Sequence, residues 1–280
     1  MSDSQGCRGD AFRALLERLP WVLGVCLAVA LPAAAAELPD RVQEPPDLLP
    51  SYPIQRVSAD ISIDGLADEA DWRVAGAVEL VVPWRHDVEE PIQQTTVRML
   101  WSATELYIVY KCVDPFIRAE IVEHDGATYL EDTVEIFATP NPDDVWKYYG
   151  YEMNVRGTLL DYITFWRDGK RLSGGRGWQS EGVRIATTID GTLNDDSDRD
   201  RGWILEIAIP FDNFRHLGGT IPPRPGDRWR LNLNRCAGKV AGQYAMWSDS
   251  GTEQPQFHVP ERFGIARFSA DVVGNGAERP

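Results

Sequence analysis

The stretch YLEDTVEIFATPNPDDVWKYYGYEMNVRG, residues Tyr129–Gly157, decides the fold. It predicts two strands, Asp132–Ala138 and Tyr148–Val155, because both runs are rich in aromatic and β-branched residues of alternating polarity. The segment between them, Thr139–Asp144, is rich in Pro, Asn and Asp, which favours a turn. We therefore expect two adjacent antiparallel strands here.

Side-chain alternation gives this strand pair one apolar and one polar face. Glu135, Glu152 and Asn154 are expected to share the polar face. A polar sheet face with aromatic residues nearby can hold a hydrated polyhydroxyl ligand, but the same pattern fits the solvated face of an antiparallel sheet. The apolar stripe of the second strand consists of Tyr149, Tyr151, Met153 and Val155.

Strand signals recur at roughly ten-residue spacing through the chain, separated by Gly, Pro and Asp. Helix is expected only as single turns such as Pro210–Phe214, since no sustained 3.6-residue apolar period occurs after the N-terminus. The pattern predicts an all-β protein: an antiparallel, jelly-roll-like β-sandwich in a single domain. The further strands are predicted at Thr95–Trp101, Glu105–Val113, Leu159–Trp166, Gly182–Ile189, Trp203–Ile209, Asp227–Cys236, Gln243–Ser248 and Gly264–Ser269, and Asp60–Asp71 is expected to form a short strand and turns that bury Trp72.

The N-terminus has the order of a secretory signal peptide. Three arginines precede the apolar run Trp21–Ala36, which ends in small residues, so residues 1–36 are expected to be removed after Ala36. An uncleaved anchor fits less well, because the run is shorter than the about 20 residues of a membrane span. A Pro-rich lead-in at 37–53, the sandwich at 54–270 and a disordered tail at 271–280 would follow, in a secreted or periplasmic protein.

The composition restricts the partners. The formal net charge is −15, so the surface disfavours nucleic acid and anionic lipid, and neutral ligands or divalent cations are more natural partners. No other stretch is apolar enough to cross a membrane. The mature chain is expected to be a monomer.

Two of the four cysteines, Cys112 and Cys236, lie outside the predicted signal peptide. Both are at the ends of predicted strands, and disulfides persist outside the cytoplasm, so a bridge between them is one expectation. Two buried thiols are the other. No zinc-binding spacing of cysteines or histidines is present.

Several motifs, in this order and spacing, give the chain a resemblance to a known family. The motifs are Ile63-Asp64-Gly65 with Trp72, Leu106-Tyr107-Ile108 with Asp114, Glu131 to Phe137, Asn154 with Gly157, Gly202-Trp203 to Pro210, Trp247-Ser248-Asp249, and Arg262-Phe263-Gly264. From Ile54 to about Phe268 the chain resembles a family 9 carbohydrate-binding module. The resemblance implies a non-catalytic β-sandwich that grips sugar chain ends between two aromatic rings.

The same resemblance implies a set of sugar-binding residues. The two ring positions fall on Tyr129 and Phe257, which are smaller than the tryptophans of the family's sugar binders. Asn234 alternates with Asn232 on one face of its strand, where asparagine needs a polar partner. Glu152 occupies the place of a binder's arginine. Polar contacts are implied for Glu135, Asn154 and Asn234, and Trp146 and Trp178, among the tryptophans in polar segments, are candidates for an additional ring.

The loop DGTLNDDSDRD, Asp190–Asp200, is dense in acidic residues. Oxygen ligands at alternate positions suit Ca²⁺, and the family resemblance implies structural calcium, although the spacing is not that of an EF-hand. A solvated acidic turn is the alternative. The proposed ligands are Asp190, Asn194, Asp196, Asp198 and Asp200.

The sequence thus predicts a secreted carbohydrate-binding protein that binds mono-, oligo- or polysaccharide and assists glycan breakdown, with no organic cofactor. Other functions stay open at this point. Glu135 and Glu152 would form a glycosidase pair if suitably spaced. A non-covalent haem b module would need axial ligands such as Met153 or Met246 with His or Lys. A structural or interaction domain with an inert polar face is the remaining possibility.

Overall fold

The computed structural model describes residues 49–84, 91–173, 177–238 and 242–274. The predicted signal peptide and most of the predicted lead-in and tail lie outside these residues. The strands are β1 (Ser51–Arg56), β2 (Val78–Glu79), β3 (Thr95–Trp101), β4 (Glu105–Val113), β5 (Thr133–Thr139), β6 (Lys147–Asn154), β7 (Leu159–Arg167), β8 (Lys170–Ser173), β9 (Arg184–Asp190), β10 (Gly202–Pro210), β11 (Arg228–Ala237), β12 (Gln243–Met246) and β13 (Gly264–Val272). The helical segments are α1 (Ala70–Val74), η2 (Thr128–Leu130), η3 (Phe211–Leu217) and η4 (Pro260–Arg262).

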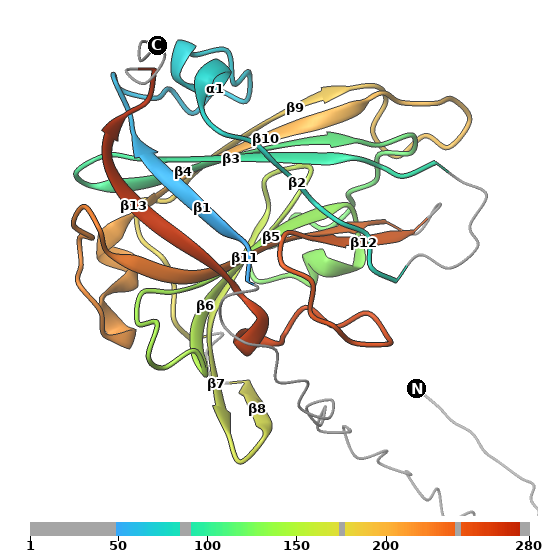
Figure 1. The fold of residues 1–280 in the computed structure, drawn as a ribbon. Coiled ribbons are helices and arrows are strands. Elements are labelled where there is room, and N and C mark those ends of the chain that lie inside the picture. The colour runs from blue at the N-terminus through green and yellow to red at the C-terminus, as the bar shows by residue number, and fades with distance from the viewer. Residues whose placement is uncertain (1–48, 85–90, 174–176, 239–241, 275–280) are drawn as a thin grey trace, which may run out of the picture. The chain divides into compact units, whose positions relative to one another are not determined.

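All strands of the described chain belong to one hydrogen-bonded sheet (Figure 1). Its order is β8-β7-β6-β5-β11-β13-β1-β3-β4-β10-β9, with β12 beside β11 and β2 beside β3. The predicted strand pair is present: β5 and β6 are antiparallel neighbours. Strand β1 differs from the antiparallel prediction, because it lies parallel to both β13 and β3 and joins the two halves of the sheet.

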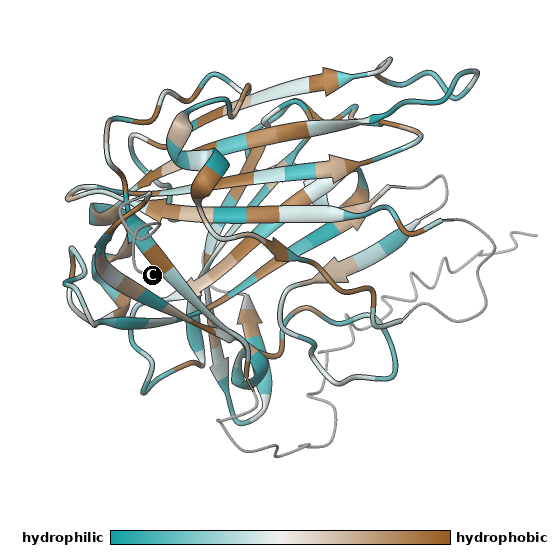
Figure 2. Ribbon diagram, turned by 45° about the horizontal axis from the view of Figure 1, so that its top comes forward, coloured by the Kyte–Doolittle hydropathy of each residue, from teal (hydrophilic) through white to brown (hydrophobic). Residues whose placement is uncertain are grey.

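The two halves of the sheet face each other across one apolar core, which confirms the predicted sandwich. Ile136 and Tyr151 from one half and Ile207 from the other belong to the same buried cluster. The hydroxyl of Tyr110 on β4 donates to the backbone carbonyl of Glu135 on β5 at 2.8 Å. Hydrophobic and hydrophilic residues alternate along many strands in Figure 2, as expected where one face of a sheet is packed on a core.

The segment before α1 has no strand, contrary to the prediction for Asp60–Asp71. It forms a loop that packs against β9 and β10 instead. Trp72 is buried as predicted, and its Nε1–H donates to Glu206 at 2.9 Å. The backbone N–H of Gly65 donates to the same carboxylate at 2.7 Å, with φ at 82° and the position of a Cβ only 2.8 Å from the backbone of Thr187. A glycine is therefore required at this turn.

Within the described ranges, no helix has the length and apolarity needed to cross a membrane.

Candidate functional site

A row of polar side chains crosses the outer face of the half-sheet formed by β7, β6, β5 and β11. We call this surface the polar face. The strand register places Glu135 directly opposite Glu152 on one side and Asn234 on the other. Direct opposition in an antiparallel pair brings Cβ atoms to about 4.5–5.5 Å, so these three side chains form one continuous row. Alternation correctly predicted that Glu135 and Glu152 share a face.

Neighbouring side chains hold the row in place. Asn234 donates to Glu135 at 3.4 Å, and the thiol of Cys236 lies 3.5 Å from the other oxygen of that carboxyl group. On the opposite side, the hydroxyl of Tyr162 donates to Glu152 at 2.6 Å. The two glutamates are 3% and 4% exposed, so they form the base of the face and not its rim.

Burial changes the ionisation of the row. The pKa of Glu135 is raised well above its usual value, first by burial and then by the neighbouring charge of Glu152. The pKa of the Tyr162 hydroxyl is also raised well above its usual value, by burial and by the same glutamate. The pair of carboxyl groups therefore favours keeping a proton, which lets the row donate as well as accept hydrogen bonds.

Tyr162 reaches the glutamates because a glycine lies beneath it. Its pairing partner on β6 is Gly150, and a Cβ at that position would lie 2.3 Å from the tyrosine ring. The guanidinium of Arg171 on β8 lies over the same ring, 5.6 Å from its centroid. Arg171 thus brings a positive charge to the polar face, where the sequence analysis found only Glu152 in place of an arginine.

Tyr129 lies in η2 at the edge of the polar face and is 43% exposed. The residue before it, Thr128, donates to the backbone carbonyl of Glu152 at 3.3 Å and fixes η2 against β6. The exposed ring of Tyr129 is therefore attached to the strand that carries the row.

Phe257 is partly buried and belongs to a group of three aromatic residues. Its ring centroid lies 5.8 Å from that of Trp84 and 6.0 Å from that of Tyr244. Tyr244 pairs with Cys236 and therefore lies on the same face as the row. Trp84, and not Trp146 or Trp178, is the tryptophan beside Phe257. Trp84 is not among the ring candidates selected from the sequence, although it too lies in a polar segment.

His258 anchors the segment that carries Phe257. Its ring stacks on Phe137 with centroids 4.7 Å apart, and its Nδ1 lies 2.8 Å from the hydroxyl of Tyr148. Burial, followed by the charge of Arg171, lowers the pKa of His258 well below its usual value. The neutral imidazole therefore acts as a packed hydrogen-bonding group at this end of the polar face.

The remaining predicted ligands have partners within the protein. Asn154 donates to Ile121 O at 2.9 Å and to Glu131 at 3.1 Å, and its Oδ1 accepts two backbone N–H groups, so it holds the loop before η2. Trp146 packs edge-on against Trp166. Trp178 packs against Tyr149 and Tyr151 beside the core. A sugar contact of these three side chains stays a prediction.

The acidic loop does not gather its side chains around one point. Asp190 pairs with Arg201, and Asp196 pairs with Arg118 at 2.7 Å. Asn194 bonds the backbone of Ala119 through both its amide atoms. In the described part of the chain, no three carboxylates of this loop come together, and calcium binding here stays a prediction. Asp200 accepts the N–H groups of Ile117 and Thr192, and Asp198 is exposed.

The predicted disulfide is wrong: Cys112 and Cys236 are two free, buried thiols. Cys112 lies in the core between the two halves of the sheet, whereas Cys236 lies on the polar face beside Glu135. The sheet itself separates the two sulfur atoms. Burial raises the pKa of Cys112 to about 12.

The methionines named for a haem site are on opposite faces. Met153 is in the core, while Met246 pairs with Asn234 on the polar face. Met153 therefore cannot reach a ligand bound to the polar face.

Comparisons with known proteins agree with this architecture. No match is found among curated proteins. A crystal structure of a candidate carbohydrate-binding protein from Bacteroides uniformis ATCC 8492 matches with a TM-score of 0.64 at 23% identity, over 79% of this chain and 100% of that one. A carbohydrate-binding module of family 9 from Caldicellulosiruptor kristjanssonii with cellotriose matches with a TM-score of 0.53 at 15% identity, over 82% and 98%. The same organism's module with glucose matches at 0.50 and 16%, over 82% and 100%.

At these identities the solved structures show a shared fold. The sequence model for carbohydrate-binding family 9 matches residues 81–268, which span β3 to β13 and contain the whole polar face. The chain therefore belongs to carbohydrate-binding family 9.

Proposed function

We propose that this protein is exported, is not a catalyst, and binds a saccharide on its polar face. One observation carries the proposal: the row Glu152, Glu135 and Asn234 lies on one sheet face, with the exposed ring of Tyr129 attached to it and Tyr244 and Phe257 nearby. Aromatic rings cover the C–H faces of a sugar ring, and carboxyl and amide groups bond its hydroxyls. The row and the rings supply both kinds of contact.

The expected affinity is moderate. Each hydrogen bond contributes about 1 kcal/mol net and each buried ring about 1–3 kcal/mol, which corresponds to dissociation constants between about 1 µM and 1 mM. The related structures that contain cellotriose and glucose make glucose and β-linked gluco-oligosaccharides the first ligands to test.

A binding role fits the glutamate pair better than hydrolysis. A glycosidase needs one ionised carboxylate within reach of the sugar carbon and a second group that exchanges protons with leaving group and water. Here both carboxyl groups are buried, and Tyr162 already binds Glu152. The export proposal rests on the signal-like residues 1–36 of the sequence. Assistance to a separate glycan-degrading enzyme is the role that such a protein would have.

Titration calorimetry with glucose, cellobiose, cellotriose and matched xylo- and manno-oligosaccharides tests the proposal. Tyr129→Ala and Phe257→Ala should each weaken binding by about tenfold or more without loss of folded structure. Leu66→Ala is the control, because Leu66 is 52% exposed and lies in the loop before α1. Absence of a binding signal with every sugar, or equal sugar affinity of the three variants, would overturn the proposal. Hydrolysis of cellotriose by the protein would overturn its non-catalytic part.

A further inference from the structure

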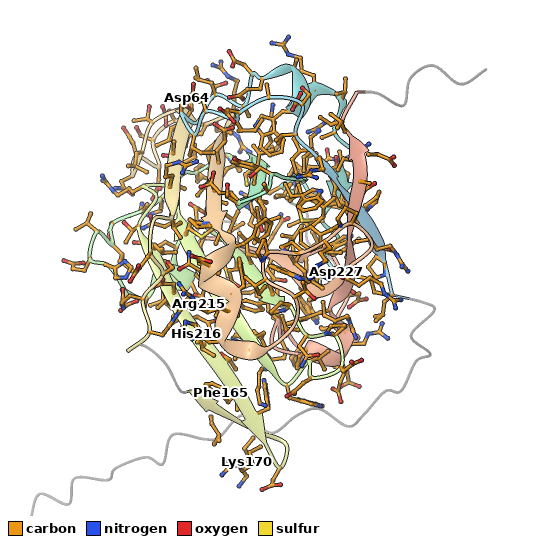
Figure 3. The ribbon with its side chains drawn as sticks, turned by 90° about the vertical axis from the view of Figure 1, so that its left-hand side faces the viewer. Asp64, Phe165, Lys170, Arg215, His216 and Asp227 are labelled. Carbon is orange, nitrogen blue, oxygen red and sulfur yellow. The ribbon has the colours of Figure 1, made fainter. Side chains whose placement is uncertain are left out.

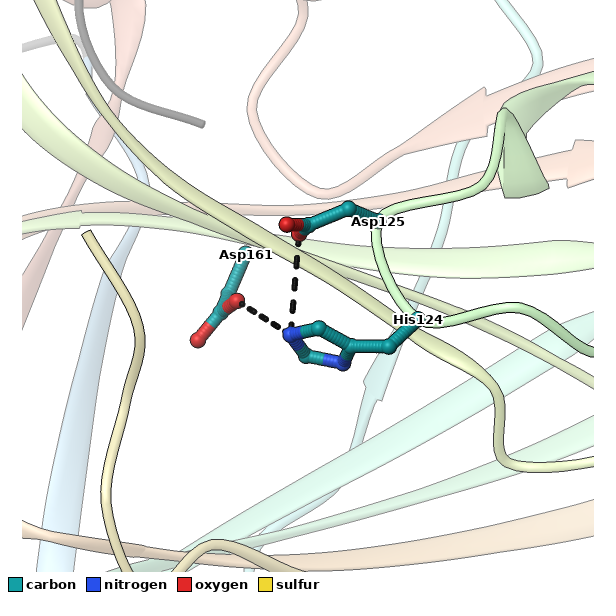
Figure 4. A group of neighbouring side chains, drawn as sticks. All are labelled: His124, Asp125 and Asp161. Atoms are coloured by element: carbon teal, nitrogen blue, oxygen red, sulfur yellow. Dashed lines mark ion pairs between the residues drawn. The ribbon is translucent and has the colours of Figure 1, made fainter. Parts of the chain in front are cut away.

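A second cluster of polar groups lies away from the polar face, at the start of β7. Figure 4 shows His124 and Asp125 from the loop before η2, with Asp161 of β7 turned towards them. The Nε2 atom of His124 lies 3.3 Å from Asp161 Oδ1 and 3.6 Å from Asp125 Oδ1. One ligand atom from each of the three residues lies within 4.8 Å of the other two. Three metal-binding groups therefore point at one small volume.

A fourth group comes from the segment before β9. The side-chain oxygen of Gln179 contacts Nε2 of His124, while the side-chain nitrogen of Gln179 donates to Asp125 at 2.8 Å. That hydrogen bond fixes the amide so that its oxygen faces the imidazole. The cluster thus offers one nitrogen and three oxygens.

The carboxylates of the cluster argue most strongly that it can bind a cation. Asp161 is fully buried, and its Oδ2 accepts the backbone N–H of Ser180 at 2.6 Å. Its Oδ1, and Oδ1 of Asp125, are buried without a hydrogen-bond partner among the described residues. A buried carboxylate oxygen without a partner destabilises the folded protein, unless a cation or a hydrogen-bond donor compensates its charge. Both of these oxygens face the same imidazole nitrogen.

The spacing indicates which cation fits. Ligands at about 2.0–2.1 Å from a tetrahedral Zn²⁺ lie about 3.3 Å from one another. The distances of 3.3 and 3.6 Å from His124 to the two aspartates agree with this value. Ca²⁺ prefers six to eight oxygen ligands at longer distances, and an imidazole does not suit it.

We propose that His124, Asp125, Asp161 and Gln179 bind a divalent transition-metal ion of the Zn²⁺ class. The site is distinct from the acidic loop at 190–200, where Asp190, Asp196 and Asp200 have other partners. It is open on one side, because the side chain of His124 is 49% exposed while that of Asp161 is 0% exposed. An ion can enter past the histidine and rest on the buried carboxylate.

The backbone is arranged to support the ligands without the ion. The N–H of Asp125 donates to Leu159 O at 3.0 Å, which fixes the loop against β7, and the φ of Asp125 is 62°, a left-handed conformation. The bound ion would tie together the loop before η2, strand β7 and the segment at 177–180. That loop continues directly into η2 and Tyr129.

The test uses the protein after treatment with a chelator, titrated with ZnCl₂ alone by calorimetry. We expect one equivalent to bind with a rise in Tm, and His124→Ala and Asp161→Asn to weaken binding by at least about tenfold. His216→Ala is the matched control, since this histidine is exposed on η3 and outside the cluster. Its affinity for Zn²⁺ should equal that of the wild type. Because His124 is exposed, its variant tests the site even if Asp161→Asn does not fold.

Substitution with Co²⁺ gives an independent readout, because a tetrahedral site produces intense visible absorption that His124→Ala should abolish. Zn²⁺ binding that is absent, or equally tight in wild type and His124→Ala, would overturn the proposal. Tighter binding of Ca²⁺ than of Zn²⁺ would overturn the assignment of the ion. No sugar is present in these measurements, so their outcome is independent of the proposed saccharide binding.

Discussion

At the scale of single residues, the paired glutamates dominate the chemistry of the polar face. Alternation gives each of the two strands one apolar and one polar face, and turning both apolar faces to the core puts Glu135 and Glu152 on the same side, as the register of β5 and β6 confirms. It could not predict that Tyr162 would bind Glu152, or that Asn154 would turn into the loop before η2. These contacts depend on the order of the strands in the sheet. The local polarity pattern of a sequence does not give that order.

Glu135→Gln should change how stability depends on pH. A carboxyl group whose pKa is raised by folding stabilises the folded state below its unfolded pKa. That contribution is lost as the pH rises through the folded pKa. The pKa of Glu135 is raised by burial and by Glu152, so the variant should gain stability relative to the wild type as the pH rises above about 4.5. Urea unfolding at about pH 4, 6 and 8 measures this difference.

Glu253→Gln serves as the control for this series, because Glu253 is exposed and outside the row. Its difference from the wild type should stay constant across the same pH range. A constant difference for Glu135→Gln as well would contradict the burial of a proton-holding pair.

Gly150→Ala should displace Tyr162 from the row. The added Cβ would lie 2.3 Å from the tyrosine ring, so the ring must move or the strands must separate. Overpacking of this kind costs about 1–3 kcal/mol of unfolding free energy, which urea denaturation would measure. Gly177→Ala is the control, since nothing lies within 4 Å of its added Cβ. Equal stability of the two variants would argue against the tight contact between Gly150 and Tyr162.

At the scale of elements, strands with strong alternation were predicted well, whereas β1, β2 and β8 were missed. The predicted limits of β3 and β4 coincide with those observed. Strand β1 was hidden by Pro50 and Pro53 in a segment that resembled an extended lead-in, although Tyr52 and Ile54 are buried in alternation. Strand β8 follows the turn at Asp168 and Gly169, both with positive φ, a two-residue hairpin signal that the sequence analysis did not use.

The β7–β8 hairpin matters because it carries Arg171 to the polar face. Figure 3 shows Lys170 at the far end of this hairpin and Phe165 further back along β7. The Nε atom of Arg171 is buried without a hydrogen-bond partner among the described residues. The proposed binding of a saccharide would give this N–H an acceptor. In the proposed saccharide binding, Arg171 of β8 takes the role of the arginine that the resemblance implies for the position of Glu152 on β6.

Arg171→Ala should weaken sugar binding by about tenfold, the effect of removing one charged hydrogen bond. Arg167→Ala lies on the same hairpin and is exposed, so its affinity should match that of the wild type. Calorimetry with the best sugar of the panel compares the two. If both variants bind like the wild type, the hairpin has no part in recognition.

At the scale of the whole molecule, composition and motif order were sufficient to predict a β-sandwich. They did not predict how its two halves are joined. The parallel strand β1 between β13 and β3 joins the two halves of the sheet, and local patterns carry no information on such long-range pairing. The prediction of a disulfide was wrong for a related reason. Both cysteines lie near strand ends, but the register places Cys112 in the core and Cys236 on the opposite face of the sheet.

A crystal structure of the protein with the tightest-binding oligosaccharide of the panel shows directly whether a sugar binds to the polar face. We expect the sugar on the outer face of β5, β6 and β11, stacked on Tyr129 or Phe257, with a hydroxyl within hydrogen-bonding distance of Glu135, Glu152 or Asn234. A sugar bound on the other half of the sheet, over β4, β9 and β10, would contradict saccharide binding at the polar face.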